Sequence, residues 1–386
     1  MSGVARAGAE DDRRSVSDRP LDRTPGSLSE ARPDPVAGPD AAPRRFARLR
    51  PGDRVAVIAP SGPVDPVRLK AGCDVLRDLG LEVTVGEHAL DRVPLGPPGV
   101  TEGSEGTEGA GWQRLAGEDA DRAADLVAAW CDPEVRAVLC ARGGYGATRL
   151  LGLIDWDKII EAGRGTAPKI LHGSSDVTAL HAAFARRLGI TTSFGPMTVG
   201  ELLAEGAGER EQALRHLRAV LFGPEAGEDG TGATDLTGDR VLRAGRAEGL
   251  LTGGTLALLA ALLGTPDAPP PAAGRIVFLE DVGEAPYRID RMLTQLLRAG
   301  WFDGAAGIVL GPWHDCGDPA ELDAVVAGRL GPLGVPILAG VPAGHGPRQL
   351  TLELGAPYRL DTGTLTLAGP PPPGSDRADG PRGGLR

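Results

Sequence analysis

Short apolar runs alternate with stretches of helical periodicity in the first half of the chain. Strands that end in loops are predicted over 54–62 (RVAVIAPSG), 81–87 (LEVTVGE), 137–146 (AVLCARGGYG) and 169–176 (KILHGSSD). Helices are predicted between them, as over 119–132, where apolar residues recur at helical spacing. This alternation is typical of a parallel sheet covered by helices, so the predicted fold class is α/β.

The second half of the chain has a different pattern. Its most apolar segment, 250–263, predicts a buried helix, which we assign to 254–263, and RIVFLED over 275–281 predicts a strand. Another helix is predicted to end at Gly300, because the apolar residues before it recur at helical spacing: Ile289, Met292, Leu293, Leu296 and Leu297. GIVLGPW and VPILAGVPAG indicate further strands, and 350–367 alternates like a terminal hairpin.

These patterns suggest how the chain is divided. We predict an N-terminal parallel-sheet α/β domain over 46–200 and a smaller mixed α/β domain over 248–368. The polar interval 201–247 is predicted to be irregular and to link them. The remaining segments contain too few apolar side chains to offset the entropy of ordering, and are predicted to be two disordered tails and one surface insertion: 1–45, 369–386 and 96–111.

Composition narrows the functional class. The 41 basic and 52 acidic residues give a net charge of −11, which disfavours nucleic acid and anionic membranes as partners. The segment 250–263 is too short to span a bilayer, and residues 1–45 contain no signal-peptide core. The four cysteines lie far apart with no C-x-x-C pair: Cys73, Cys131, Cys140 and Cys316. We therefore predict a cytoplasmic protein with no disulfide framework, no metal site and no other cofactor.

A candidate nucleophile lies in the turn HGSSD, where a predicted strand passes into a helix. Such a turn exposes a serine hydroxyl, and the helix N-terminus favours developing negative charge, so Ser175 is the candidate. The alternative is that Ser174, Ser175 or Asp176 only caps the helix, which is the commoner role for these residues. The strict G-x-S-x-G pattern is absent, because Val177 occupies the place of the second glycine.

A second candidate turn is rich in glycine. Gly143, Gly144 and Gly146 in ARGGYG allow backbone to approach a ligand closely and offer N–H donors to an oxyanion or a phosphate. The segment matches neither G-x-G-x-x-G nor a Walker sequence with its lysine, so nucleotide binding is disfavoured. An ordinary strand-to-helix turn is an equally good explanation.

A nucleophilic serine needs a base, and the chain offers six histidines: His88, His172, His181, His216, His314 and His345. His345 is preferred because it lies between glycines in PAGHGPR, directly after an apolar strand, where a loop can present it to a cleft. His181 and His216 fall in predicted helices and are expected to be surface or packing residues. His314, in GPWHDC, could be a second group of the site.

A carboxylate that orients the histidine is also needed. Glu280 ends the strand RIVFLED, beside Asp281, where it could hold an imidazole ring. A solvated strand end is the commoner explanation for an acid in such a place.

The ordered set of segments resembles the LD-carboxypeptidase family, the muramoyltetrapeptide carboxypeptidases. The similarity runs from about residue 54 to 367 through VIAPSG, LAGEDADRAADL, ARGGYGATRLLGLIDW, GSSDVTALHAAFARRLG, FGPM, AEGLLTGGTLALLAALLGTP, FLEDVGEAPYRIDRMLTQLLRAG and GHGPRQLTLELG. It implies a serine nucleophile at Ser175, a carboxylate at Glu280 and a histidine base at His345. One departure is Thr255, since the family often has Asn after the glycine pair; the tails and the 96–111 insertion also have no counterpart.

The resemblance implies further site residues. Oxyanion donors would be the backbone N–H groups of Asp176 and of Gly143 or Gly144. Substrate binding is assigned to Arg142 and Tyr145. The bidentate fork of Arg142 suits a substrate carboxylate, although a structural salt bridge explains the arginine equally well.

The function implied is that of a serine carboxypeptidase of peptidoglycan recycling. It would release terminal D-alanine from cytoplasmic murein tetrapeptides, acting as a homodimer without a metal. One alternative is a peptidase of the same superfamily that confers self-immunity to peptidyl-nucleotide antibiotics of the microcin C type, although GGYG followed by RLL is closer to the recycling enzymes. The other is a non-catalytic murein-peptide binding protein, which the intact set of Ser175, Glu280 and His345 argues against.

Overall fold

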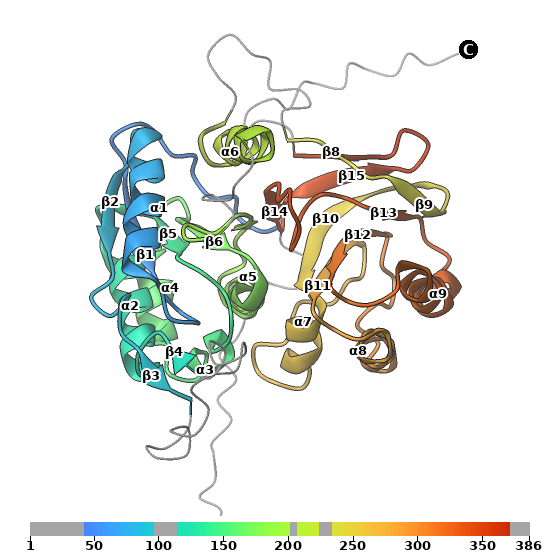
Figure 1. Cartoon of the computed structure of the whole chain (residues 1–386), viewed down its shortest axis with the longest axis horizontal. Coiled ribbons are helices and arrows are strands. Elements are labelled where there is room, and N and C mark those ends of the chain that lie inside the picture. The colour runs from blue at the N-terminus through green and yellow to red at the C-terminus, as the bar shows by residue number, and fades with distance from the viewer. Residues whose placement is uncertain (1–41, 96–113, 201–206, 224–233, 371–386) are drawn as a thin grey trace, which may run out of the picture. The chain divides into compact units, whose positions relative to one another are not determined.

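The strands of the first half of the chain pair into a sheet that also includes β14 from the second half, in the order β14-β7-β6-β5-β1-β2 (Figure 1). The computed structural model describes residues 42–95, 114–200, 207–223 and 234–370. β14 runs antiparallel to β7, whereas the other neighbours in this first sheet run parallel. Its strands are β1 (Arg54–Ile58), β2 (Glu82–Val85), β5 (Val135–Cys140), β6 (Ile170–Gly173), β7 (Thr192–Phe194) and β14 (Leu352–Leu354).

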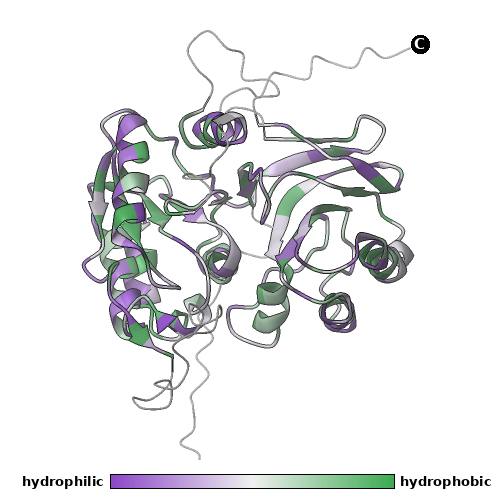
Figure 2. Cartoon of the chain, viewed as in Figure 1, coloured by the Kyte–Doolittle hydropathy of each residue, from purple (hydrophilic) through white to green (hydrophobic). Residues whose placement is uncertain are grey.

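Helices bury both faces of the first sheet. Along β1, Val55 and Val57 face one apolar core while Ala56 and Ile58 face another, as the two-residue period of a strand requires. The first core also includes residues of α1 and α6, and the second includes residues of α2, α4 and α5. Figure 2 shows apolar and polar residues side by side on α1, as expected of a helix with one face on a core. The helices of this half are α1 (Pro66–Asp78), α2 (Asp119–Cys131), α3 (Ala147–Leu150), α4 (Trp156–Ala162), α5 (Thr178–Leu188) and α6 (Ala207–Phe222).

The second half of the chain forms a mixed sheet of order β8-β16-β15-β10-β11-β12-β13-β9. Strands β10 to β13 are parallel, and antiparallel strands flank them on both sides. The strands are β8 (Leu236–Thr237), β9 (Arg240–Arg243), β10 (Arg246–Thr255), β11 (Arg275–Val282), β12 (Gly307–His314), β13 (Ile337–Ala339), β15 (Pro357–Asp361) and β16 (Thr366–Ala368). One face carries α7 (Leu256–Leu262), α8 (Pro286–Arg298) and α9 (Pro319–Leu330). A small separate pair, β3 (Val93–Pro94) and β4 (Arg114–Leu115), lies before α2.

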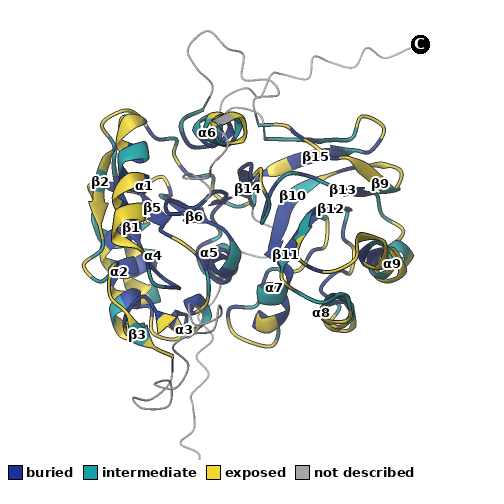
Figure 3. Cartoon of the chain, in the orientation of Figure 1, coloured by how far each residue is buried: buried dark blue, intermediate teal, exposed yellow. Residues whose placement is uncertain are grey.

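The other face of the second sheet packs against the β7–β14 edge of the first sheet. Phe278 of β11 and Phe194 of β7 meet edge to face with ring centroids 5.3 Å apart, and both side chains are fully buried. Leu352 of β14 joins the same apolar core. Two buried strands lead to the candidate residues (Figure 3). β6 ends just before Ser175, and β11 contains Glu280.

The α/β class with a largely parallel first sheet and a mixed second sheet is confirmed, but several sequence predictions need correction. The helix predicted over 254–263 is present as α7, but it begins only at Leu256 because the strand β10 continues to Thr255. Gly253 has φ +125°, and a Cβ there would lie 1.9 Å from the Phe278 carbonyl oxygen, so the end of β10 is in close backbone contact with β11. The interval 201–247 is not irregular throughout, since it includes α6, β8 and β9.

The third correction concerns 350–367. The strands β15 and β16 do form an antiparallel hairpin, but β14 leaves it and pairs with β7, Leu352 opposite Phe194. Alternation reveals that a segment is a strand and not which edge it joins. The boundaries of the predicted domains, 46–200 and 248–368, stay predictions.

The disordered tail predicted over 1–45 includes residues at its end that are part of the fold. Arg44 forms a β-bridge with Ile190, and Arg45 forms an ion pair with the buried Glu353 at 2.8 Å, so ordered structure begins before residue 46. At the other end Gly369 donates its N–H to Asp235 at 2.8 Å. Residues 1–41, 371–386 and the 96–111 insertion lie outside the described residues. No described helix combines the length and the hydropathy that a membrane span requires.

Candidate active site

Ser175 lies in the turn between β6 and α5. After Gly173 the chain forms one turn of 3-10 helix, Ser175–Val177, and continues as α5. Ser175 has φ +57°, a left-handed conformation that costs energy for a residue with a Cβ and is often retained at functional sites. Neither the 3-10 helix nor α5 receives a side-chain cap, so the capping alternative does not describe this serine. The turn instead presents the half-buried Ser175 hydroxyl to a histidine.

The structure brings Ser175, His345 and Glu280 together from three separate segments. His345 Nε2 lies 3.0 Å from Ser175 Oγ, and His345 Nδ1 lies 2.7 Å from Glu280 Oε2. The carboxylate is fully buried, whereas 20% of the His345 side chain is exposed. Because an ionised carboxylate can only accept, Nδ1 is assigned the proton, which leaves the Nε2 lone pair facing the serine hydroxyl.

Glu280 is held from several sides. Its Oε2 also accepts the backbone N–H of His345 at 2.9 Å, and its Oε1 accepts the Thr255 hydroxyl at 2.5 Å. The loop before the histidine needs a glycine at position 344, which has φ +103°, because a Cβ there would lie 2.5 Å from Glu280 Cγ. The solvated strand end considered for Glu280 is therefore not what the structure contains.

The glycine turn lies directly beside the serine. A Cβ on Gly143 would be 2.9 Å from Ser175 Cβ and 3.1 Å from its Oγ, so only glycine lets the two segments approach this closely. Gly144 has φ +113° and packs against Gly62. The proposed oxyanion role of the N–H groups of Asp176 and of Gly143 or Gly144 stays a prediction, and this proximity is compatible with it.

The Asp176 carboxylate joins three loops of the site. Its Oδ2 accepts the Ser61 hydroxyl at 2.6 Å and the Ala147 N–H at 2.7 Å. Burial raises the pKa of Asp176, and the bond from Ser61 counteracts part of that effect. The side chain thus anchors the residue whose backbone N–H is the predicted oxyanion donor. The local sequence gives no sign of this role for Ser61, the serine of VIAPSG, because its partner lies 115 positions away.

The residues predicted to bind substrate lie at the exposed side of the glycine turn. Arg142 is exposed and donates through Nη1 to the Pro63 carbonyl at 3.2 Å. The Tyr145 side chain is 42% exposed. Their assignment to substrate binding is not tested by this geometry.

The other histidines have different surroundings. His172, His181 and His216 are buried, and burial lowers the pKa of each to about 4, so they are neutral packing residues. This fits the packing role predicted for His181 and His216. The His314 side chain is 51% exposed, and its Nε2 lies 3.4 Å from Asp315 Oδ2.

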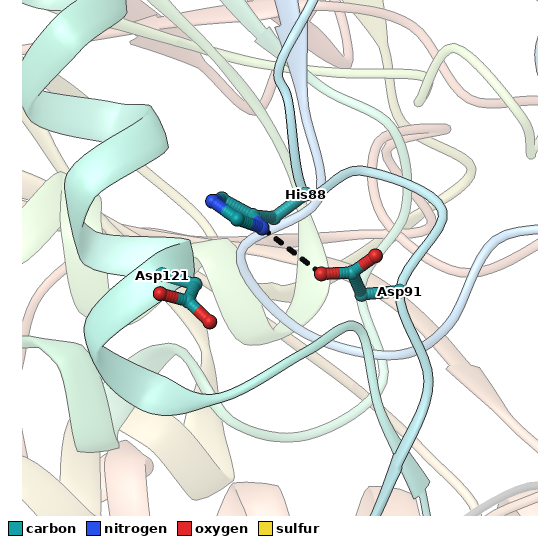
Figure 4. A group of neighbouring side chains, drawn as sticks. All are labelled: His88, Asp91 and Asp121. Carbon is teal, nitrogen blue, oxygen red and sulfur yellow. Dashed lines mark hydrogen bonds and ion pairs between the residues drawn. The ribbon is translucent and has the colours of Figure 1, made fainter.

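One cluster of potential metal ligands lies away from the serine (Figure 4). His88, Asp91 and Asp121 have ligand atoms within 4.8 Å of one another, and His88 Nδ1 lies 2.9 Å from Asp91 Oδ2. That hydrogen bond raises the pKa of His88. The group has no signature in the local sequence because Asp121 is distant along the chain from His88 and Asp91. Exposed acidic groups of this kind are common without an ion, and we assign it no metal.

The chain resembles known proteins in both sequence and fold. Models of the LD-carboxypeptidase N-terminal and C-terminal domains match residues 55–195 and 248–360. A putative carboxypeptidase of Streptomyces coelicolor is 51% identical over 328 residues, covering 84% of this chain and 96% of the relative. A murein tetrapeptide carboxypeptidase of Pseudomonas aeruginosa is 32% identical, with 81% and 94% covered. The crystal structure of a muramoyltetrapeptide carboxypeptidase from Oxalobacter formigenes is similar with a TM-score of 0.64 and 27% identity, covering 82% of this chain and 98% of that one.

Proposed function

The chain belongs to the LD-carboxypeptidase family of serine peptidases, and on that premise we propose that it removes the terminal D-alanine from murein tetrapeptides. The observation that carries the proposal is the continuous chain of contacts from Ser175 Oγ through His345 to Glu280. The Pseudomonas aeruginosa relative, which this chain matches over 94% of that protein's length, is named a murein tetrapeptide carboxypeptidase. We place the reaction in peptidoglycan recycling in the cytoplasm and expect a homodimer, as the family resemblance implies.

In the proposed mechanism, His345 is the general base. Its Nε2 takes the Ser175 proton as Oγ attacks the carbonyl carbon of the bond before D-alanine. The ring is then a cation, and the buried carboxylate of Glu280, 2.7 Å from Nδ1, stabilises it in a site of low dielectric. The same proton is next delivered to the amine of D-alanine, which leaves.

The oxyanion is assigned to backbone donors. The N–H groups of Asp176 and of Gly143 or Gly144 would bind the negative oxygen of the tetrahedral intermediate. The support is that these residues lie beside Ser175 and that Asp176 is fixed by Ser61 and Ala147. Water, activated by the neutral His345, then hydrolyses the acyl-enzyme by the same steps in reverse order.

A carboxypeptidase must recognise the free carboxylate of its substrate. We assign this to Arg142, whose planar guanidinium matches a carboxylate with two N–H donors, with Tyr145 beside it. Both side chains are exposed next to the glycine turn that contacts Ser175. Substitution of Arg142 by Lys would therefore raise KM more than it lowers kcat.

Substrate choice distinguishes this proposal from its alternatives. The purified protein is incubated separately with murein tetrapeptide and with a peptidyl-nucleotide of the microcin C type, and free D-alanine and released amino acid are quantified. Release of D-alanine with little action on the peptidyl-nucleotide supports the proposal. The reverse preference would assign the chain to antibiotic self-immunity, and tetrapeptide binding with no product from either would indicate a non-catalytic binding protein.

A further inference from the structure

Two threonines extend the hydrogen-bond network of Ser175, His345 and Glu280. Thr178, at the start of α5, accepts the backbone N–H of Thr255 through Oγ1 at 3.1 Å. The hydroxyl of Thr255 donates to Glu280 Oε1 at 2.5 Å, and Glu280 Oε2 accepts from His345, whose Nε2 returns to Ser175. Through Thr255, this network connects α5, the helix that follows Ser175, to β11, the strand that contains Glu280.

The Thr255 hydroxyl is not used in the way its position suggests. Thr255 directly precedes α7, where a threonine usually caps the helix through its side chain. Here it makes no capping bond, and Asp281 Oδ2 accepts the Ala257 N–H at 2.8 Å in its place. The hydroxyl is thereby left for Glu280, its partner in the parallel register of β10 and β11.

Burial makes this contact important for the carboxylate. Glu280 is 0% and Thr255 is 3% exposed, and a buried carboxylate oxygen needs a donor because water does not reach it. His345 supplies both donors to Oε2, and Thr255 supplies the donor to Oε1. The end of β10 also packs closely on the start of α5, since a Cβ on Gly254 would lie 2.7 Å from the Thr178 side chain.

We propose that Thr255 is a positioning residue: its hydroxyl holds the Glu280 carboxylate in the orientation that receives His345, and its amide ties that carboxylate to the nucleophile helix through Thr178. Thr255 touches no reacting atom and acts through Glu280. The inference rests on the proposed catalytic roles of Ser175, His345 and Glu280.

The test compares variants that differ by one group. Thr255→Val replaces the hydroxyl by a methyl, and Thr255→Ser retains the hydroxyl. Thr252→Val is the matched control, because Thr252 is also buried in β10 but lies opposite Val277. Removing a partner that orients a site residue typically costs about 10- to 100-fold in activity, so Thr255→Val is expected to lower kcat by that amount with KM within about twofold. Thr255→Ser and Thr252→Val are expected to stay within about threefold of wild type, because both leave the Glu280 contact in place.

A readout without substrate separates this inference from the proposed function. The Nδ1 proton of His345, identified by its loss in His345→Ala, is followed by proton NMR, where sharing with a carboxylate moves it far downfield. It is expected to move upfield in Thr255→Val and to keep its position in Thr255→Ser. If the wild type releases no D-alanine while this proton behaves as expected, the substrate assignment fails and the positioning role stands.

Two results would overturn the positioning role. One is a Thr255→Val protein with wild-type kcat and an unmoved proton. The other is a Thr255→Ser protein that loses as much kcat as Thr255→Val. Should Thr255→Val fold poorly, Thr255→Ala removes the hydroxyl without placing a methyl group against the carboxylate, and the same loss of kcat is expected from it.

Discussion

His345 donates two hydrogen bonds to a single oxygen of Glu280, one from its backbone N–H at 2.9 Å and one from its ring Nδ1 at 2.7 Å. The backbone bond fixes the position of the loop, and the ring bond fixes the rotation of the imidazole. With both in place, Nε2 faces Ser175 Oγ at 3.0 Å. One buried carboxylate oxygen therefore sets both the place and the tautomer of the proposed base.

Glu280→Gln tests the charge of that carboxylate. The amide can turn its oxygen toward His345 and its NH₂ toward the Thr255 hydroxyl, so the shape of the site survives while the charge is lost. We expect kcat for D-alanine release to fall by roughly 10²- to 10⁴-fold, less than for loss of the serine, with a melting temperature close to wild type. A kcat within a few-fold of wild type would show that the charge does not matter.

Gly143→Ala tests the close approach of the glycine turn to the serine. The new Cβ would lie 2.9 Å from Ser175 Cβ, so the turn must shift away from the nucleophile. If its N–H is an oxyanion donor, kcat should fall by about 10²- to 10³-fold. Gly152→Ala is the control, since a Cβ there meets nothing within 4 Å, and it should leave kcat unchanged. Equal activity of the two variants would argue against the oxyanion assignment.

Two truncations test which N-terminal residues the fold requires. Removing residues 1–41, which contain few apolar side chains, should leave turnover and melting temperature nearly unchanged. Removing 1–48 also deletes Arg45 and Arg48, which form ion pairs with Glu353 at 2.8 and 3.1 Å, and the buried Phe46. An unpaired buried charge alone costs about 3–5 kcal/mol, so the longer truncation should melt at least several degrees lower. Identical thermal unfolding of the two proteins would contradict this.

His181→Gln tests the buried neutral histidines. Burial lowers the pKa of His181 to about 4 in the folded protein, below the usual 6.5, while its Nε2 lies 3.0 Å from the Gly173 carbonyl. Between these two pH values the unfolded chain binds a proton that the folded protein does not, so stability from this group is complete above pH 6.5 and is lost as the pH falls toward 4. Glutamine can keep the donor and does not titrate.

The measurement for His181 is the free energy of unfolding in urea at pH 7.5 and near pH 4.5. Relative to wild type, the glutamine variant should gain roughly 2–3 kcal/mol on acidification, because about 1.4 kcal/mol corresponds to each pKa unit. Burial also raises the pKa of Asp281 to about 7, which acts in the opposite direction, but that group is common to both proteins and cancels. A difference that does not change with pH would show that His181 is not held neutral.

The sequence predicted those parts of the fold and site that depend on local pattern. Strand-to-turn transitions identified Ser175 and Glu280, and the glycines around His345 indicated a loop. Each of these signals arises within about ten residues, where strand periodicity and turn chemistry act. The resemblance to known enzymes supplied what the local patterns left open, namely that these segments belong to one site.

The sequence did not reveal contacts made across long separations. β14 alternates like its neighbours but pairs with β7, and nothing local to Leu352 distinguishes the two edges. Arg45 lies in a polar segment typical of a tail, yet its partner Glu353 is 308 positions away. Thr255 falls within the helix predicted over 254–263, and only the approach of β11 shows that its hydroxyl is directed to Glu280.

The central claim is that Ser175 is the nucleophile of a chain of three residues that act as one unit. Ser175→Ala and His345→Ala should each lower D-alanine release from murein tetrapeptide by roughly 10⁴- to 10⁶-fold, and the double variant should be scarcely worse.

The most direct measurement is D-alanine release and melting temperature on one preparation of Ser175→Ala. We predict nearly complete loss of release with a melting temperature close to that of the wild type. If the Ser175 hydroxyl served only to stabilise the turn through its hydrogen bond to His345, alanine would instead cost about 0.5–1.5 kcal/mol of stability and leave release nearly normal. A destabilised but active Ser175→Ala protein would contradict the catalytic assignment.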